Sequence, residues 1–199
     1  RGTLRYKGYC EAWNIFVQMG ITDDSYTFPL REGSTYREFA SAFLPGTGLD
    51  FSARIQNLSN GGFSKEAIDK VFWTGLFDER PIGLERATPA MILQALLEEK
   101  WRLQEHDKDL VLMQHQIGFY QGAKRMLLTS SLQVKGQDSK HTAMAQTVGM
   151  PLAITCRLFL EGKFSTRGVL IPINPEVYEP VLAELESQGI RFTETLQAH

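Results

Sequence analysis

The sequence predicts an α+β protein, in which a sheet-bearing α/β domain is interrupted by an all-helical lobe. Three observations carry this prediction. Apolar residues recur at helical spacing between residues 35 and 104, they alternate with polar residues from 109 to 119, and helical and extended patterns alternate in the last third of the chain. The predicted domains are therefore residues 1–34 together with 105–199, and a helical insertion over 35–104.

The chain opens with a short predicted strand over Thr3–Tyr6 and a helix over residues 9–19. The apolar face of this helix consists of Tyr9, Trp13, Phe16 and Val17. Gly20 follows as a stop signal. Because the chain begins with Arg1 inside a strand, we expect it to be a fragment of a longer protein.

Helix start signals mark the insertion. Thr35 and Glu38 form a predicted capping box, Ser64 is a predicted N-cap, and Thr88-Pro89 places a cap before a proline at the first helical position. A further short helix is expected over residues 49–58. The insertion therefore reads as about four helices.

After residue 105 the period changes. The alternation predicts a hairpin with strands over residues 109–119 and 125–134. The elements expected after it are a helix over 142–161 with a kink near Gly149 caused by Pro151, a strand over 168–173, a helix from Asn174-Pro175 to Gly189, and a strand over 190–196.

Composition excludes several classes. Among 199 residues, 43% are apolar and 22% charged, and the formal net charge is −2. No basic stripe indicates nucleic-acid binding, and no apolar run is long enough for a membrane span or a signal peptide. Cys10 and Cys156 are predicted to be buried and reduced, so we expect a cytoplasmic protein.

Few residues indicate chemistry by themselves. His115 falls on the apolar side of a strand, which favours a core or interface histidine, and Asp107-Lys108-Asp109 reads first as a strand start. Gly46-Thr47-Gly48 follows a helix and lacks the full glycine fingerprint of a dinucleotide site. We predict no metal ligands and no cofactor-binding residues in this chain.

Thr3 and Arg5 share one face of the predicted first strand. A threonine hydroxyl and a guanidinium fork suit a carboxylate ligand. On these two residues alone, a surface arginine on an edge strand is the stronger interpretation.

Longer segments add a resemblance. Residues 1–9 (RGTLRYKGY) resemble the substrate-domain signature of glutamate-forming saccharopine dehydrogenases and of the dehydrogenase half of aminoadipic semialdehyde synthases. Further segments that are similar to this family, in its order, are 73–77 (WTGLF), 107–115 (DKDLVLMQH), 144–151 (MAQTVGMP) and 168–182. The loop over residues 136–142 departs from the family pattern.

The resemblance implies the substrate domain of a Rossmann-type dehydrogenase whose Rossmann half is absent from this chain. In the family, the complete enzyme uses NAD or NADP to oxidise saccharopine, and the resulting imine is hydrolysed to glutamate and aminoadipate semialdehyde in lysine metabolism. The family's substrate-binding triplet falls on Thr3, Leu4 and Arg5. The partners implied are saccharopine and the missing Rossmann domain, with a homodimer left open, and this chain alone is expected to be inactive and to bind no NAD or NADP.

Two alternatives stay open. One is a related imine-forming or imine-reducing oxidoreductase that acts on another amino acid or a polyamine. The other is a binding or assembly module without catalysis.

Overall fold

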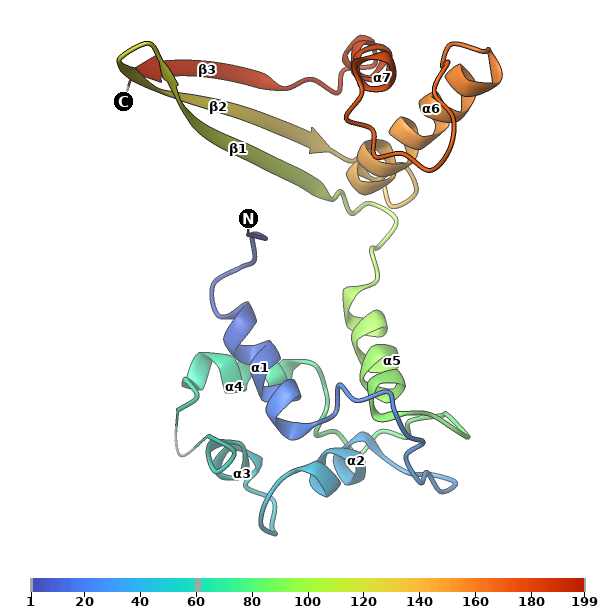
Figure 1. Ribbon diagram of the computed structural model, residues 1–199. Coiled ribbons are helices and arrows are strands. Elements are labelled where there is room, and N and C mark those ends of the chain that lie inside the picture. Colours follow the sequence, from blue (N-terminus) through green and yellow to red (C-terminus); the bar gives the residue numbers. More distant parts are fainter. Residues whose placement is uncertain (1, 60–61, 199) are drawn as a thin grey trace. The chain divides into compact units, whose positions relative to one another are not determined.

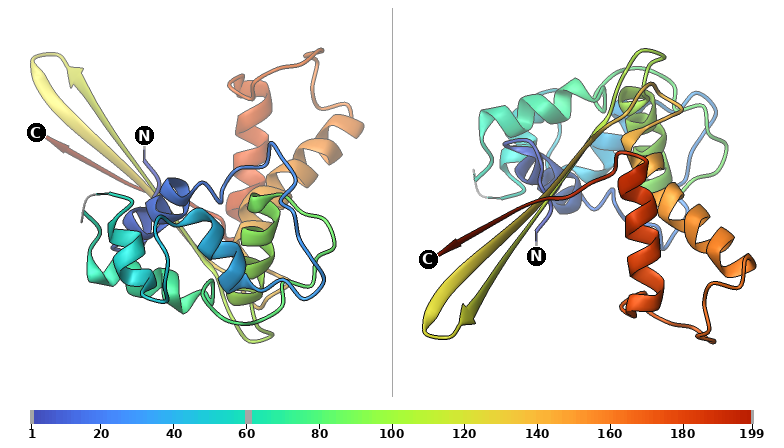
Figure 2. Two further views of the ribbon diagram at one scale, coloured as in Figure 1. Left: turned by 90° about the horizontal axis from the view of Figure 1, so that it is seen from below. Right: turned by 90° about the horizontal axis from the view of Figure 1, so that it is seen from above.

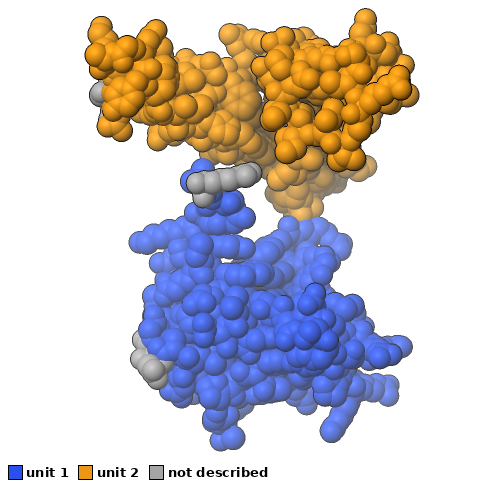
Figure 3. Space-filling view, in the orientation of Figure 1, with its two compact units in different colours: residues 1–102 blue, residues 103–199 orange. Residues whose placement is uncertain are grey.

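The computed structural model describes residues 2–59 and 62–198, and the chain divides into two compact units (Figure 1). Unit 1 spans residues 1–102 and unit 2 spans residues 103–199, coloured blue and orange in Figure 3. Within the described residues, no helix is long and apolar enough to cross a membrane. Helices and a small antiparallel sheet together confirm the predicted α+β class.

The regular secondary structure of unit 1, within its described residues, is helical, with two isolated β-bridges between its loops. Its helices are α1 (Tyr9–Met19), α2 (Tyr36–Phe43), α3 (Phe51–Gln56), α4 (Lys65–Trp73) and α5 (Pro89–Trp101). The predicted caps are confirmed: the capping box of Thr35 and Glu38 is complete, and the side chains of Ser64 and Thr88 accept hydrogen bonds from backbone N–H groups in the first turns of α4 and α5. These caps satisfy N–H groups that the helix itself leaves without partners.

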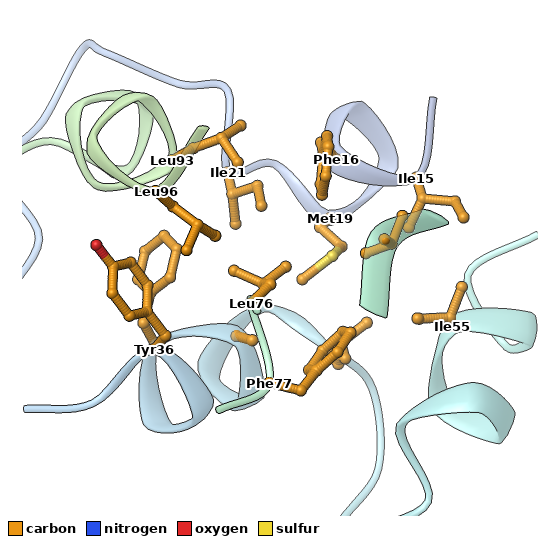
Figure 4. Close-up of a cluster of buried hydrophobic side chains, with 14 of the residues drawn as sticks. Ile15, Phe16, Met19, Ile21, Tyr36, Ile55, Leu76, Phe77, Leu93 and Leu96 are labelled. Atoms are coloured by element: carbon orange, nitrogen blue, oxygen red, sulfur yellow. The ribbon is translucent and has the colours of Figure 1, made fainter. Parts of the chain in front are cut away.

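The core of unit 1 draws side chains from all five helices (Figure 4). Ile15 of α1, Ile55 of α3 and Leu96 of α5 are fully buried, as is Leu76 in the turn after α4. Aromatic rings fill the remaining space, and the Phe39 ring lies edge-on to Phe28 with 5.1 Å between centroids. Burial of this apolar surface is the main source of stability for the unit.

Helix α1 belongs to a different unit from the one that the sequence predicts. The prediction places residues 1–34 with 105–199, whereas Ala12, Ile15, Phe16 and Met19 of α1 lie in the core of unit 1. Helix α1 packs against α4. Periodicity shows that α1 has an apolar face but not which element covers that face.

Unit 2 combines a three-stranded sheet with helices. Its elements are β1 (Leu110–Gln121), β2 (Lys124–Lys135), the π-helical segment η1 (Ala145–Gly149), α6 (Met150–Leu160), α7 (Pro175–Ser187) and β3 (Thr193–Ala198). The strand order is β1-β2-β3, and both pairings are antiparallel. The predicted hairpin is confirmed, with Gly122 at φ 63° in the two-residue connection, where a left-handed conformation favours glycine.

The helices of unit 2 cover only part of the sheet. Figures 1 and 2 show α6 and α7 at one end, with the tip of the β1–β2 hairpin extending beyond them. Leu132 and Val134 of β2 are buried in a core with Ile154, Leu158, Val181 and Leu185 of the two helices. On the same face of the sheet nearer the hairpin tip, Ile117 remains 52% exposed.

The predicted kink near Gly149 appears as a change of helix type. The chain is π-helical over η1 and becomes α-helical at Met150, so the two segments join directly. Pro151 lacks an N–H group, and a wider turn before it accommodates the missing hydrogen bond.

Two predicted strands are absent from the described structure. Residues 3–6 and 168–173 form no strand, and Val169 and Ile173 are exposed. Both segments contain β-branched or aromatic residues that favour an extended backbone, but a strand also requires a hydrogen-bonded neighbour. The local sequence therefore indicates a preference for the extended conformation and does not specify a partner strand.

Candidate functional site

The segment that carries Thr3, Leu4 and Arg5 leads directly into α1. The Tyr9 N–H donates to the carbonyl of Tyr6 at 3.0 Å, which closes a turn over Lys7 and Gly8. Gly8 has φ 79°, a left-handed conformation that favours glycine. The turn fixes the direction in which residues 3–6 leave the helix.

Gly8 also allows a close approach to α4. A Cβ atom at this position would lie 3.2 Å from Nζ of Lys70 and 3.4 Å from Oε1 of Glu66. An ion pair joins Lys70 and Glu66 on α4. The first turn of α1 and the start of α4 therefore lie together beside the candidate triplet.

A hollow of about 780 Å³ lies between these segments. It is lined by Thr3, Leu4, Arg5, Tyr6, Lys7, Gly8, Cys10, Glu11, Ser64 and Glu66. All three predicted substrate-binding residues thus contribute to one concave surface, although the strand on which their shared face was predicted is not formed.

The Arg5 guanidinium lies at the edge of this hollow. Its Nη1 donates to the carbonyl of Leu4 at 2.7 Å, and its central carbon lies 5.5 Å from the centroid of the Tyr9 ring. A guanidinium has five N–H donors in a planar fork. The aromatic contact orients the fork, and most of its donors can still bind an anion.

The two carboxylates of the hollow are already engaged. Glu11 accepts hydrogen bonds from the backbone N–H and the hydroxyl of Ser64, which hold the pKa of Glu11 below its ordinary value. The hydrogen bond from Lys70 and its charge lower the pKa of Glu66 in the same way. Both acids are therefore ionised at neutral pH, and their carboxylates are engaged by Ser64 and by Lys70 respectively.

Asp109 has a structural role. Its carboxylate accepts hydrogen bonds from the N–H groups of Ala143 (2.6 Å) and Met144 (2.9 Å), where the helical segment leading to η1 begins. A Cβ atom on the buried Gly136 would lie only 2.2 Å from Oδ1 of Asp109. The structural interpretation of this acidic segment is therefore supported, and the pairing with Gly136 was not visible in the sequence.

His115 does not lie in the core of unit 2, so the core interpretation is wrong, while the interface interpretation stays a prediction. The side chain is exposed, and its ring lies 6.1 Å from the ring of Phe192. The apolar alternation of β1 continues past the part of the sheet that α6 and α7 cover. For this reason a position on the apolar face does not ensure burial.

The loop that departs from the family pattern contains an interaction that the sequence reasoning missed. Asp138 accepts hydrogen bonds from the N–H groups of Lys140 and His141, and its carboxylate lies 3.0 Å from Nδ1 of His141. These contacts, led by the backbone N–H of His141, lower the pKa of Asp138. The Asp-x-x-His spacing was the available signal, and the exposed pair orders the loop.

Both cysteines are free, as predicted, but Cys10 and Cys156 are exposed rather than buried. Cys10 lies on the outer face of α1, where it lines the hollow. Its aromatic neighbours in the sequence point to the other face of the helix.

The segment Gly46-Thr47-Gly48 is not shaped as a phosphate cradle. It lies in a loop that surrounds the buried Arg54, whose guanidinium donates to the carbonyls of Ser41, Leu44, Pro45 and Gly48 at 2.8–3.2 Å. A pyrophosphate requires N–H groups at the start of a helix that follows a strand. These residues do not fit a dinucleotide.

Residues 1–190 match the family described as the saccharopine dehydrogenase C-terminal domain. The chain is 31% identical to a saccharopine dehydrogenase [NADP(+), L-glutamate-forming] from Pyricularia oryzae, covering 100% of this chain and 46% of the relative. It is 28% identical to the mitochondrial alpha-aminoadipic semialdehyde synthase of Rattus norvegicus, covering 96% of this chain and 21% of that protein.

A solved structure is also similar. The apo histidine-tagged saccharopine dehydrogenase (L-Glu forming) from Saccharomyces cerevisiae superposes with a TM-score of 0.78 at 28% sequence identity. The match covers 100% of this chain and 46% of the yeast chain. The chain thus spans about half the length of the saccharopine dehydrogenases that it matches.

Proposed function

Because the chain belongs to the saccharopine dehydrogenase C-terminal domain family, we propose that it forms the substrate-binding part of an NADP-dependent enzyme that oxidises saccharopine. The products would be glutamate and aminoadipate semialdehyde. The observation that carries this proposal is that Thr3, Leu4 and Arg5 line one open hollow, with the Arg5 fork at its edge.

The chemistry of the hollow supports a carboxylate ligand. Arg5 and Lys7 contribute positive charge, while the hydrogen bonds of Glu11 and Glu66 direct their negative charge towards Ser64 and Lys70. Saccharopine carries three carboxylates, and a planar guanidinium binds a carboxylate through two parallel hydrogen bonds. Such a two-point contact fixes the orientation of the substrate as well as its position.

We expect the nucleotide to bind to a part of the complete enzyme outside these residues. The relatives named above as dehydrogenases are NADP-dependent, and the single Gly-x-Gly segment of the described chain surrounds Arg54 instead. We therefore expect this chain by itself to bind neither NAD nor NADP. Calorimetric titration with both nucleotides tests this expectation, and a micromolar dissociation constant for either would contradict it.

The direct test of the proposal is steady-state kinetics with saccharopine and NADP in the complete protein. Loss of a charge-assisted hydrogen bond costs about 1.5–3 kcal/mol, so Arg5→Ala should lower kcat/KM for saccharopine by about 10- to 150-fold. Arg5→Lys should recover only part of this loss, because an ammonium group lacks the planar fork. The affinity for NADP should change little.

The exposed Arg86 of the same unit provides a matched control, because it lies outside the hollow. Arg86→Ala should leave kcat/KM unchanged. Wild-type kinetics for Arg5→Ala would remove Arg5 from the substrate site. No NADPH formation by the wild-type protein would favour another substrate of the same chemistry or a binding module.

A further inference from the structure

An apolar pocket adjoins the hollow, and all three tryptophans of the chain line it. Its volume is about 290 Å³, near the lower limit of about 300–1,000 Å³ for ligand pockets. Its lining consists of Tyr6, Tyr9, Ala12, Trp13, Phe16, Lys70, Val71, Trp73, Thr74 and Trp101, all from unit 1. We refer to it as the tryptophan pocket.

The side chains at the bottom of the tryptophan pocket are buried, whereas those at its rim are exposed. Ala12, Phe16 and Val71 form part of the floor and are buried in the core of unit 1, whereas Trp73 is 59% and Trp101 is 51% exposed. Large apolar side chains that remain exposed together around a concave surface are typical of binding sites.

Ring stacking holds the walls of the pocket in place. The rings of Tyr9 and Trp13 are nearly parallel, with 6.1 Å between centroids, and the Trp13 and Trp101 rings stack with 6.4 Å between centroids. The hydroxyl of Thr74 donates to the carbonyl of Val71, so this polar group is already satisfied. The interior therefore offers rigid apolar surface to a ligand.

The rim of the pocket is cationic. The Arg5 guanidinium lies over the Tyr9 ring, and Nζ of Lys100 lies 5.8 Å from the centroid of the Trp73 ring. Lys70, which is ion-paired with Glu66, lines the pocket itself. Tyr6 lines both the pocket and the hollow that contains Thr3 and Arg5. The two sites are thus adjacent, and the Arg5 guanidinium of the hollow lies over Tyr9, a lining residue of the pocket.

An apolar interior with a cationic rim suits a ligand that joins an aliphatic chain to a carboxylate. We propose that the tryptophan pocket binds the aliphatic arm of the substrate while Arg5 binds a carboxylate, so that the pocket selects substrates by chain length. This inference rests on the proposed function, because it places the substrate at Arg5. Trp73 and Trp101 are then specificity-determining residues.

Chain-length dependence provides the test. Linear carboxylates from butanoate to octanoate are titrated by calorimetry into the complete protein without substrate. Burial of one methylene group corresponds to about 4-fold in affinity, so the dissociation constant should fall about 3- to 4-fold per added methylene until the pocket is filled. In Trp101→Ala and Trp73→Ala this factor should drop below about 2.

Two controls separate the pocket from general effects. Tyr26→Ala removes an exposed aromatic ring of unit 1 outside the pocket. It should leave the change in dissociation constant per added methylene, the chain-length factor, as in the wild type. Trp101→Phe should keep most of the wild-type factor, because the apolar wall remains. Since Trp73 and Trp101 lie on different helices, a folding defect in one variant would not explain loss of the factor in both.

The outcomes distinguish this inference from the proposed function. A wild-type protein that oxidises saccharopine, with a chain-length factor unchanged in both tryptophan variants, would overturn the pocket alone. A protein that does not oxidise saccharopine, yet loses the factor in both variants, would overturn the proposed function and support the pocket as an alkyl carboxylate site. Absence of any chain-length dependence in the wild type would also overturn the pocket.

Discussion

The core of unit 1 receives side chains from all of α1–α5, whereas the core of unit 2 is centred where α6 and α7 meet β2, with Ala143 and Ile190 added from the adjoining segments. In unit 1 the fully buried side chains come from helices and from the turns between them. In unit 2, the sequence of β1 also has an apolar face, but nearly all of the strand is exposed. The difference shows that an apolar pattern leads to burial only where a second layer covers it.

The two units should accordingly differ in stability. Unit 1 buries enough apolar surface to resist local opening, whereas the strands of unit 2 beyond its two helices have only their own hydrogen bonds. The three tryptophans all belong to unit 1, so their fluorescence reports the unfolding of this unit alone. Three variants test the comparison.

The largest effect is expected for Leu96→Ala. Leu96 is fully buried among the helices of unit 1, and truncation of a buried leucine costs about 3–5 kcal/mol. Urea unfolding followed by tryptophan fluorescence should show this decrease in the free energy of unfolding. Leu49→Ala, at a 77% exposed position of the same unit, should change it by less than about 0.5 kcal/mol.

A midpoint that stays at the wild-type value for Leu96→Ala would mean that the core of unit 1 is not the source of its stability. In that case the claim that unit 1 is the more stable unit because of its core would be wrong.

An intermediate effect is expected for Gly136→Ala in unit 2. The added Cβ would approach Oδ1 of Asp109 to 2.2 Å, so the carboxylate would have to leave the N–H groups of Ala143 and Met144. Overpacking of this kind costs about 1–3 kcal/mol. Amide hydrogen exchange of β1 and β2 should become faster while that of α1–α5 stays unchanged.

Gly118→Ala is the matched control, because a Cβ at this position of β1 would meet no atom within 4 Å. Equal effects of the two substitutions would show that loss of glycine itself, rather than the contact with Asp109, destabilises the sheet.

The smallest effect is expected from the titration of Glu11. Its pKa in the folded state is below the ordinary value of 4.5, so its contribution to stability is present above that pH and is lost as the pH falls through the folded pKa. Glu11→Gln should therefore lower the stability of unit 1 at neutral pH, and the difference from wild type should shrink as the pH falls below 4.5. Tryptophan fluorescence across this pH range is the measurement, and a difference independent of pH would assign the effect to packing.

Much of the fold was predictable where the determinants are local. The caps at Thr35, Ser64 and Thr88 depend on residues within one turn of each helix, and the hairpin depends on alternation and on Gly122. The predicted strand over residues 168–173 failed because its partner is not specified by local sequence. The grouping of α1 with α4 depends on a contact between residues more than 50 positions apart, Glu11 and Ser64.

The candidate site was predictable only in part. The nine-residue resemblance led to Thr3, Leu4 and Arg5, and the structure brings these residues to one hollow. The tryptophan pocket could not be predicted, because Trp13, Trp73 and Trp101 lie on three different helices. In the sequence they are isolated aromatic residues, and only the packing of α1, α4 and α5 makes them neighbours.

The buried Arg54 has a consequence for the loop around it. Each hydrogen bond that the structure gives its guanidinium goes to a backbone carbonyl of residues 41–48, so the side chain takes the place that a bound calcium ion occupies in other loops. Unlike such an ion, this cation is covalently attached, and a chelator cannot remove it. The loop therefore contains its own positive charge beside its carbonyl dipoles, supplied by a residue of the same chain.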